Sequence, residues 1–164
     1  MIKKQGGLKL QKYNLMEAKQ KAENYCSYRE RSQQEVKEKL YDWGIPSEGV
    51  NEIIAELITE NYLNERRFAE GYARGKFNLN GWGKIKITYG LRGKGITENL
   101  IKHALAQIEQ ASYLEKLQDI LLKKDKQLKD SDAYIRKMKL ARFAASRGFE
   151  STFIFELLED IQAG

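Results

Sequence analysis

Apolar residues in this chain recur at helical spacing on both sides of three glycines, Gly44, Gly95 and Gly148. Counted from each glycine, the positions eight and four residues before it and one, six, nine, ten and thirteen residues after it are apolar in all three copies. The glycines lie 51 and 53 residues apart. A pattern repeated at this period indicates a tandem array of structural repeats rather than one globule.

The residues around each glycine have the pattern of a helix end. Leu91 precedes Gly95 by four residues, and Ile96 follows it directly. A glycine just past a helix end adopts a left-handed backbone, and the apolar residue after it folds back onto the preceding turn. Thr97 is predicted to cap a second helix, whose apolar residues form one stripe. Each copy therefore contains a helix, a glycine corner and a second helix.

A further helix is predicted before each of these pairs. In the first copy this helix is expected from Leu15 to about Tyr28, and Ser32 with Glu35 then opens the helix that ends at Gly44. In the third copy the further helix is opened by Ser112 with Glu115. Both pairs have the spacing of capping boxes, in which each side chain bonds the backbone of the other residue. Asn64 is predicted to cap the corresponding helix of the second copy. Three helices per copy follow from these signals.

Two segments of the second copy allow competing interpretations. Residues 85–89 alternate apolar and polar like a strand, but their counterparts in the other copies are rich in helix formers, so we predict a helix. Residues 78–83 are predicted to form a loop. Its Gly-Trp-Gly-Lys sequence lacks the Gly-Lys-Ser/Thr ending of a phosphate-binding loop, so no nucleotide site is expected.

The predicted fold is all-α, with three tandem three-helix repeats that form an elongated, curved array. The repeats are expected at residues 14–60, 61–110 and 111–164. Residues 1–13 are basic and poor in apolar side chains, so they are predicted to form a flexible arm.

Residues with reactive or metal-binding side chains are few. Cys26 is the only cysteine and His103 the only histidine, so neither a disulfide, a zinc site nor a Cys-His nucleophile can be assembled within the chain. No nucleophile, base and oxyanion set is recognisable, so we expect no enzyme and no cofactor. The sequence has neither a long apolar run nor a signal peptide, which predicts a cytoplasmic protein without a membrane anchor. We expect a monomer.

The net charge of +6 favours an anionic partner. The second repeat is the most basic, since residues 66–94 contain eight Lys or Arg and only one acidic residue, Glu70. A second basic span occupies residues 123–147. The candidate residues for binding a partner or DNA are Arg66, Arg67, Arg74, Lys76, Lys84, Lys86, Arg92, Lys94, Arg136, Lys139, Arg142 and Arg147.

From the residues alone, three classes of function remain open. A curved helical array with a basic middle suits a long polymeric partner. Three-helix units with basic residues on one side also suit a helix-turn-helix protein that binds DNA directly. Against direct reading of DNA, residues 97–110 contain few side chains that recognise bases. A helical scaffold for another protein is the third class.

Several short motifs resemble the RecX family of bacterial recombination regulators over about residues 22–161. The motifs are YRERS at 28–32, YLNERRFA at 62–69, KGI at 94–96 with Ile87 and Leu91 before it, and RF at 142–143 before RGF at 147–149. They occur in the family's order and spacing. This chain differs from the family at Gly90, where an acidic residue is more usual, and at Ala144, where a larger apolar residue is more usual.

The resemblance implies a protein that takes part in homologous recombination, DNA repair and the SOS response. A member of this family binds the RecA recombinase filament on DNA and modulates it, usually as an inhibitor. It lowers ATP hydrolysis, strand exchange and the cleavage of SOS repressors. The resemblance implies no catalytic residue, and the basic side chains given above are the expected contacts, with weak non-specific contact to DNA.

Overall fold

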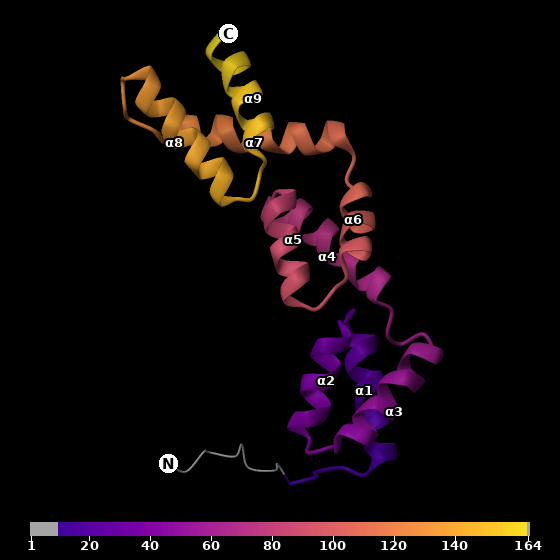
Figure 1. The fold of residues 1–164 in the computed structure, drawn as a ribbon. Helices are drawn as coiled ribbons and strands as arrows, with labels where there is room; N and C mark the ends of the chain where they lie inside the picture. Colours follow the sequence, from indigo (N-terminus) through magenta and orange to yellow (C-terminus); the bar gives the residue numbers. More distant parts are fainter. Residues whose placement is uncertain (1–9, 164) are drawn as a thin grey trace. The chain divides into compact units, whose positions relative to one another are not determined.

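The computed structural model describes residues 10–163, and these residues form nine α-helices and no strand (Figure 1). The helices are α1 (Leu15–Tyr28), α2 (Gln33–Asp42), α3 (Ser47–Thr59), α4 (Glu65–Asn80), α5 (Lys84–Gly93), α6 (Glu98–Ala106), α7 (Gln110–Gln127), α8 (Ala133–Ser146) and α9 (Ser151–Ala163). The predicted all-α class with three-helix repeats is confirmed. The elongated, curved shape and the repeat boundaries stay predictions.

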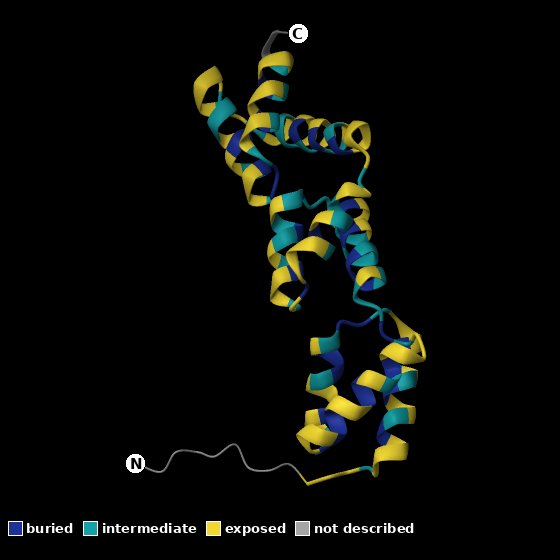
Figure 2. Ribbon diagram, turned by 45° about the vertical axis from the view of Figure 1, so that its right-hand side comes forward, coloured by how far each residue is buried: buried dark blue, intermediate teal, exposed yellow. Residues whose placement is uncertain are grey.

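The three glycine corners have the backbone conformation that the sequence predicts. The φ angles of Gly44, Gly95 and Gly148 are 77°, 74° and 94°, in the left-handed region that favours glycine. At the first corner the backbone N–H of Ile45 donates to the carbonyl of Leu40 at 3.0 Å, which closes the turn. The apolar positions eight and four residues before, and one and six residues after, each glycine are buried in all three copies. Figure 2 shows buried and exposed residues alternating along the helices.

The chain divides into two compact units. The first comprises the described residues up to Phe68 together with residues 94–96. Its core lies between α1, α2 and α3, where Ala18, Val36, Leu40 and Leu57 have no exposed surface. Ser32 and Glu35 form the predicted capping box at the start of α2.

The segment before α1 contacts the first corner. The backbone N–H of Lys12 donates to the carbonyl of Trp43 at 2.9 Å, and the rings of Tyr13 and Trp43 meet edge to face with their centroids 5.8 Å apart. A Cβ added to Gly44 would lie only 2.4 Å from the carbonyl oxygen of Leu10. Residues 1–9 of the predicted arm lie outside the described residues.

The second unit comprises residues 69–93 and the described residues from 97 onward. Its core is rich in aromatic side chains, because the ring of Tyr113 packs against Phe77, Phe149 and Phe153 at centroid distances between 5.1 and 6.2 Å. Tyr113 is among the largest fully buried side chains of the described residues. It joins α7 to α4 and α9.

The start of α5 packs against the third corner through backbone atoms. The N–H of Gly83 donates to the carbonyl of Arg147 at 2.7 Å, and the N–H of Ile85 donates to the carbonyl of Gly148 at 3.0 Å. A Cβ on Gly83 would approach the Gly148 carbonyl oxygen to 2.3 Å. Glycine is therefore required on both sides of this contact.

Residues 85–89 belong to α5, which confirms the helical interpretation of the alternating segment. On this helix Ile87 and Leu91 are fully buried. Ile85 and Tyr89 are exposed, so they lie on a different face of the helix.

Three local predictions are corrected. Residues 78–80 are helical, because α4 continues until the left-handed Gly81, with φ 66°, ends it. The capping box at Ser112 is wrong, because α7 begins at Gln110 and Ser112 lies inside its first turn. Thr97 stands at the N-cap of α6, but its side chain makes no capping hydrogen bond.

Tyr72 explains why residue 90 is glycine in this chain. A Cβ at Gly90 would lie 2.1 Å from the hydroxyl oxygen of Tyr72, whereas a Cβ at Gly75 in α4 would meet nothing within 4 Å. Gly75→Ala is expected to stabilise the protein, and Gly90→Ala to be less stable than Gly75→Ala by about 1 kcal/mol, because the outer end of the Tyr72 side chain has to shift. Urea unfolding measures both values. In a Tyr72→Leu background the difference should largely vanish, and its persistence would contradict this explanation.

Candidate partner-binding surface

Two of the predicted basic residues in the second unit are paired with carboxylates that are at least partly exposed. Arg92 lies 2.6 Å from Glu98 and Lys139 lies 2.8 Å from Asp130. The hydrogen bond from each cation favours the ionised carboxylate and lowers the pKa of Glu98 and of Asp130. A partner would have to compete with these carboxylates, although exposed pairs of this kind are weak.

Two more predicted residues are engaged within the first unit. Lys94 lies 3.0 Å from Glu35, the nearly buried carboxylate of the capping box. Arg67 pairs with Glu30 and also donates to the carbonyl of Asn61 at 3.1 Å, just beyond the end of α3. Arg67 therefore joins α4 to the connection that precedes it, and its first role is structural.

Arg136 has a similar structural role in the third repeat. Its guanidinium pairs with Asp125 and donates to the carbonyls of Leu128 and Asp130 at 3.1 and 2.7 Å. These bonds fix the connection between α7 and α8. We do not expect Arg136 to be available to a partner.

Lys76 and Lys86 meet at one aromatic ring, although the sequence places them on different helices. The Nζ atom of each lysine lies 4.7 Å from the centroid of Trp82, which follows the end of α4. The Trp82 ring also contacts Tyr72 edge to face at 6.4 Å. Lys76, Trp82 and Lys86, here called the Trp82 cluster, hold two positive charges close together by cation–π attraction.

Lys84 and Arg147 lie over aromatic rings of the third repeat. The Nζ of Lys84 is 4.9 Å from the ring of Tyr113, and the guanidinium of Arg147 is 5.1 Å from Phe143. The backbone N–H of Lys84 donates to the Tyr113 hydroxyl at 3.0 Å, and that hydroxyl donates to Glu150. Burial, with the bond to Glu150, raises the pKa of Tyr113, so it remains a neutral donor.

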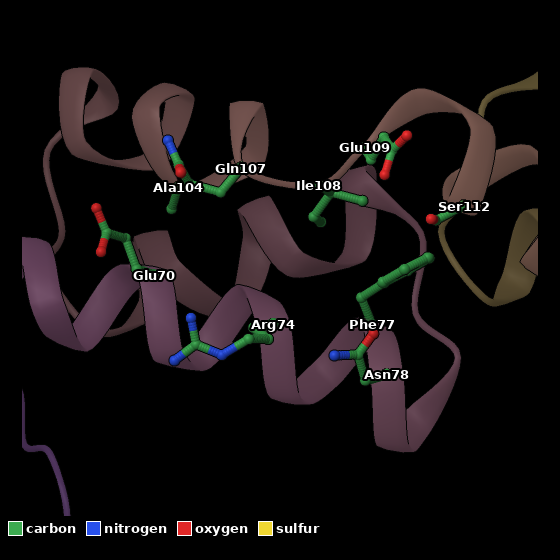
Figure 3. Close-up of a pocket in the computed structure, with 9 residues that line it drawn as sticks. All are labelled: Glu70, Arg74, Phe77, Asn78, Ala104, Gln107, Ile108, Glu109 and Ser112. Atoms are coloured by element: carbon green, nitrogen blue, oxygen red, sulfur yellow. The ribbon is translucent and has the colours of Figure 1, made fainter.

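The remaining candidates, Arg66, Arg74 and Arg142, are exposed. Arg74 lines a cavity of about 340 Å³ between α4, α6 and the start of α7 (Figure 3). Figure 3 shows Glu70 and Arg74 on α4 opposite the segment that carries Ala104 and Gln107. The lining combines Arg74 with two carboxylates and an apolar floor, so its charge is mixed and does not define an anion site.

The structure brings the predicted residues together only in part. Lys76 and Lys86 converge at Trp82, whereas Arg67, Arg92, Lys94, Arg136 and Lys139 have carboxylate partners of their own. The prediction omitted three lysines of α7, Lys116, Lys123 and Lys124, which line a second cavity. Lys123 and Lys124 follow Lys116 by seven and eight residues. This spacing places the three lysines on one helix face, and it could have identified them from the sequence.

Other kinds of site find little support among residues 10–163. No group of three or more His, Cys, Asp or Glu side chains is placed to hold a metal ion there. Within the same range no helix is both long enough and apolar enough to cross a bilayer. Cys26 is buried, and burial raises the pKa of its thiol to about 11, so it is a poor nucleophile at neutral pH.

Three family models match the chain in sequence order. They are the first three-helix domain of RecX at residues 18–57, the second at residues 64–105 and the third at residues 111–158. The chain belongs to the RecX family. The three matched segments correspond to the triplets α1–α3, α4–α6 and α7–α9. The resemblance expected from the short motifs is thereby confirmed.

Similar proteins carry the name "Regulatory protein RecX". One from Prosthecochloris aestuarii is 30% identical over 141 residues, which cover 86% of this chain and 91% of that protein. One from Clostridium acetobutylicum is 27% identical over 152 residues, covering 90% of this chain and 70% of that one. One from Bacillus mycoides is 26% identical over 139 residues, 85% of this chain and 52% of that one. This chain therefore spans about half the length of some of its RecX relatives.

Solved RecX structures have the same fold. The crystal structure of RecX from Lactobacillus salivarius superposes with a TM-score of 0.84 and 25% identity, covering 92% of this chain and 97% of that one. Another RecX crystal structure gives a TM-score of 0.81 and 26% identity, covering 89% of this chain and 71% of that one. The chain is thus a member of a family of regulatory proteins.

Proposed function

We propose that this chain binds the RecA recombinase filament on DNA and lowers RecA's ATP hydrolysis, strand exchange and SOS co-protease activity. The observation that carries the proposal is the ordered match to all three RecX domains, which includes most of the chain. The protein acts in the cytoplasm as a monomer, through binding rather than catalysis. Its two compact units bind a partner much larger than themselves.

The electrostatics of the second unit support a nucleoprotein partner. The Trp82 cluster presents two lysines beside an aromatic ring, and Arg74 and Arg142 are exposed without an ion pair among the described residues. Positive groups of this kind favour encounter with a negatively charged filament. We propose that Arg74, Lys76, Lys86 and Arg142 make the main contacts. The residues already engaged by carboxylates contribute less.

Co-pelleting tests the binding step. RecA filaments assembled on single-stranded DNA with a non-hydrolysable ATP analogue are centrifuged with the full-length protein, and naked DNA serves as the control. The proposal predicts that the protein sediments with filaments at salt concentrations where it no longer sediments with DNA. Equal recovery with naked DNA would instead favour the direct DNA-binding alternative.

Binding to DNA alone is expected to be weak and insensitive to sequence. Lysine and arginine that contact phosphates release condensed counterions, so the affinity should fall steeply between 50 and 200 mM salt. Fluorescence anisotropy with two unrelated labelled duplexes measures both properties. A preference of about 10³-fold for one duplex, the lower limit for specific binders, would identify a sequence-specific helix-turn-helix protein.

A further inference from the structure

A cavity of about 330 Å³ in the second unit lies beside the end of α4, between α7 and the region around Phe143 and Arg147. Lys116, Lys123, Lys124 and Arg147 all line it, and no carboxylate does. A cavity of this size is in the range that holds a small ligand or a few residues of a peptide. Its lining therefore favours an anionic ligand.

Three of the four cations are held in place by different contacts. Lys116 donates to the carbonyl of Asn78 at 3.3 Å and Arg147 to the carbonyl of Asn80 at 3.4 Å. These bonds offset the partial negative charge at the end of α4, which would otherwise repel an anion. Lys124 lies 4.7 Å from the centroid of Phe143.

Lys123 is the basic residue of this cavity with the greatest freedom to bind a ligand. It is exposed and forms no ion pair among the described residues. Lys116, Lys123 and Lys124 are spaced so that all three project from one face of α7. The cavity therefore combines fixed cations with one that can adjust to a ligand.

Apolar side chains lie directly beside these charges. Leu79, in the last turn of α4, is 87% exposed. Leu79 and Ile120 both line the cavity. A ligand that contacted only the cations would leave this apolar surface in water.

We propose that this cavity binds an acidic peptide segment that carries a large apolar side chain, as part of a partner protein. The carboxylates of the segment pair with Lys123 and Lys124, and its apolar side chain covers Leu79 and Ile120. A nucleic-acid strand fits less well, because phosphodiesters make no use of Leu79.

The proposal is tested with defined probes on the full-length protein, without RecA, so its failure leaves the proposed function standing. The first probe is a short fluorescein-labelled peptide of Asp and Glu around a central leucine. The second has serine in place of that leucine, and the third is labelled oligothymidylate. Fluorescence anisotropy at low ionic strength gives the affinity for each probe.

Two variants separate the contributions of charge and apolar contact. Lys123→Glu with Lys124→Glu should weaken binding of the leucine peptide by about tenfold or more, since local charge pairs are lost and replaced by repulsion. The matched control, Lys102→Glu with Lys129→Glu, changes the net charge equally on exposed residues that do not line the cavity and should cost less than about threefold. Leu79→Ser should weaken the leucine peptide by about fivefold and leave the serine peptide unchanged.

Three results would overturn the proposal. Equal losses in the two charge-reversal variants would mean that only net charge matters. If the wild-type protein binds the leucine and serine peptides with equal affinity, the apolar side chain makes no contribution to binding. If the double variant Lys123→Glu with Lys124→Glu loses oligothymidylate binding but still binds the peptide, the cavity is a nucleic-acid site. Circular dichroism of each variant confirms that the helices are intact.

Discussion

Gly148→Ala is expected to lower the free energy of unfolding of the second unit by about 2 to 5 kcal/mol, the sum of left-handed strain and overpacking. The φ angle of Gly148 is 94°, so alanine is strained before any neighbour is considered. A Cβ at this position would also lie 2.4 Å from the Cβ of Lys86 and 2.6 Å from its backbone nitrogen. Backbone atoms cannot move aside as the end of a side chain can, so the corner must separate from α5.

A double-mutant cycle with Gly83→Ala shows whether the loss comes from this contact. Gly83 has no positive φ, so its substitution by alanine acts only through the close approach to the Gly148 carbonyl and should cost about 1 to 3 kcal/mol. Because either change separates the same two segments, the double variant should lose less than the sum of the single variants. Gly75→Ala is the control, because a Cβ at Gly75 would have no atom within 4 Å, and it should stabilise the protein.

Urea unfolding of these variants gives the required free energies. Strict additivity of Gly83→Ala and Gly148→Ala would mean that the two glycines do not share a contact. If Gly148→Ala has the same free energy of unfolding as the wild-type protein, the third corner does not pack closely against α5.

Reversing Arg74, Lys76 and Lys86 to Glu is expected to weaken binding to RecA filaments by at least about tenfold. Single exposed charges contribute under about 1 kcal/mol, so one change is expected to have little effect, whereas three reversals add and also repel phosphate. Lys84 is left unchanged, because it lies on the Tyr113 ring within the core of the second unit. The co-pelleting assay described above measures the affinity.

The matched control reverses Lys102, Lys126 and Lys129, which are exposed and are not among the predicted contact residues. It has the same net charge as the first variant and should bind filaments nearly as well as the wild-type protein. If both triple variants lose affinity equally, binding depends on total charge and not on the surface around Trp82. If the folded Arg74, Lys76 and Lys86 variant binds normally, the contact surface lies elsewhere on the chain.

The fold was predictable from the sequence where the signals are local. The corner at Gly95 could be identified because Leu91, the glycine and Ile96 lie within a few residues of one another, and the same arrangement occurs three times. The false capping box at Ser112 shows the limit of such signals. A Ser-x-x-Glu sequence also fits within a helix, and the N-cap of α7 is Glu109, three residues before Ser112.

The site was less predictable, because its geometry depends on residues distant in the sequence. Charge counting found Arg67 but not its carboxylate partner, Glu30, which is 37 residues away. It also could not show that Lys76 and Lys86 share the Trp82 ring, since this requires the turn at Gly81 to bring α4 and α5 together. Basic residues could thus be listed from the sequence, but their availability depends on tertiary packing.

Measuring RecA ATP hydrolysis on single-stranded DNA tests whether this chain regulates RecA. The steady-state rate is measured with increasing amounts of the full-length protein, from well below to equimolar with RecA, and filament length is followed in parallel. The wild-type protein is expected to lower the rate, and the Arg74, Lys76 and Lys86 variant to lower it much less. A rate and a filament length unchanged by equimolar wild-type protein would contradict the assignment of this chain as a regulator of RecA.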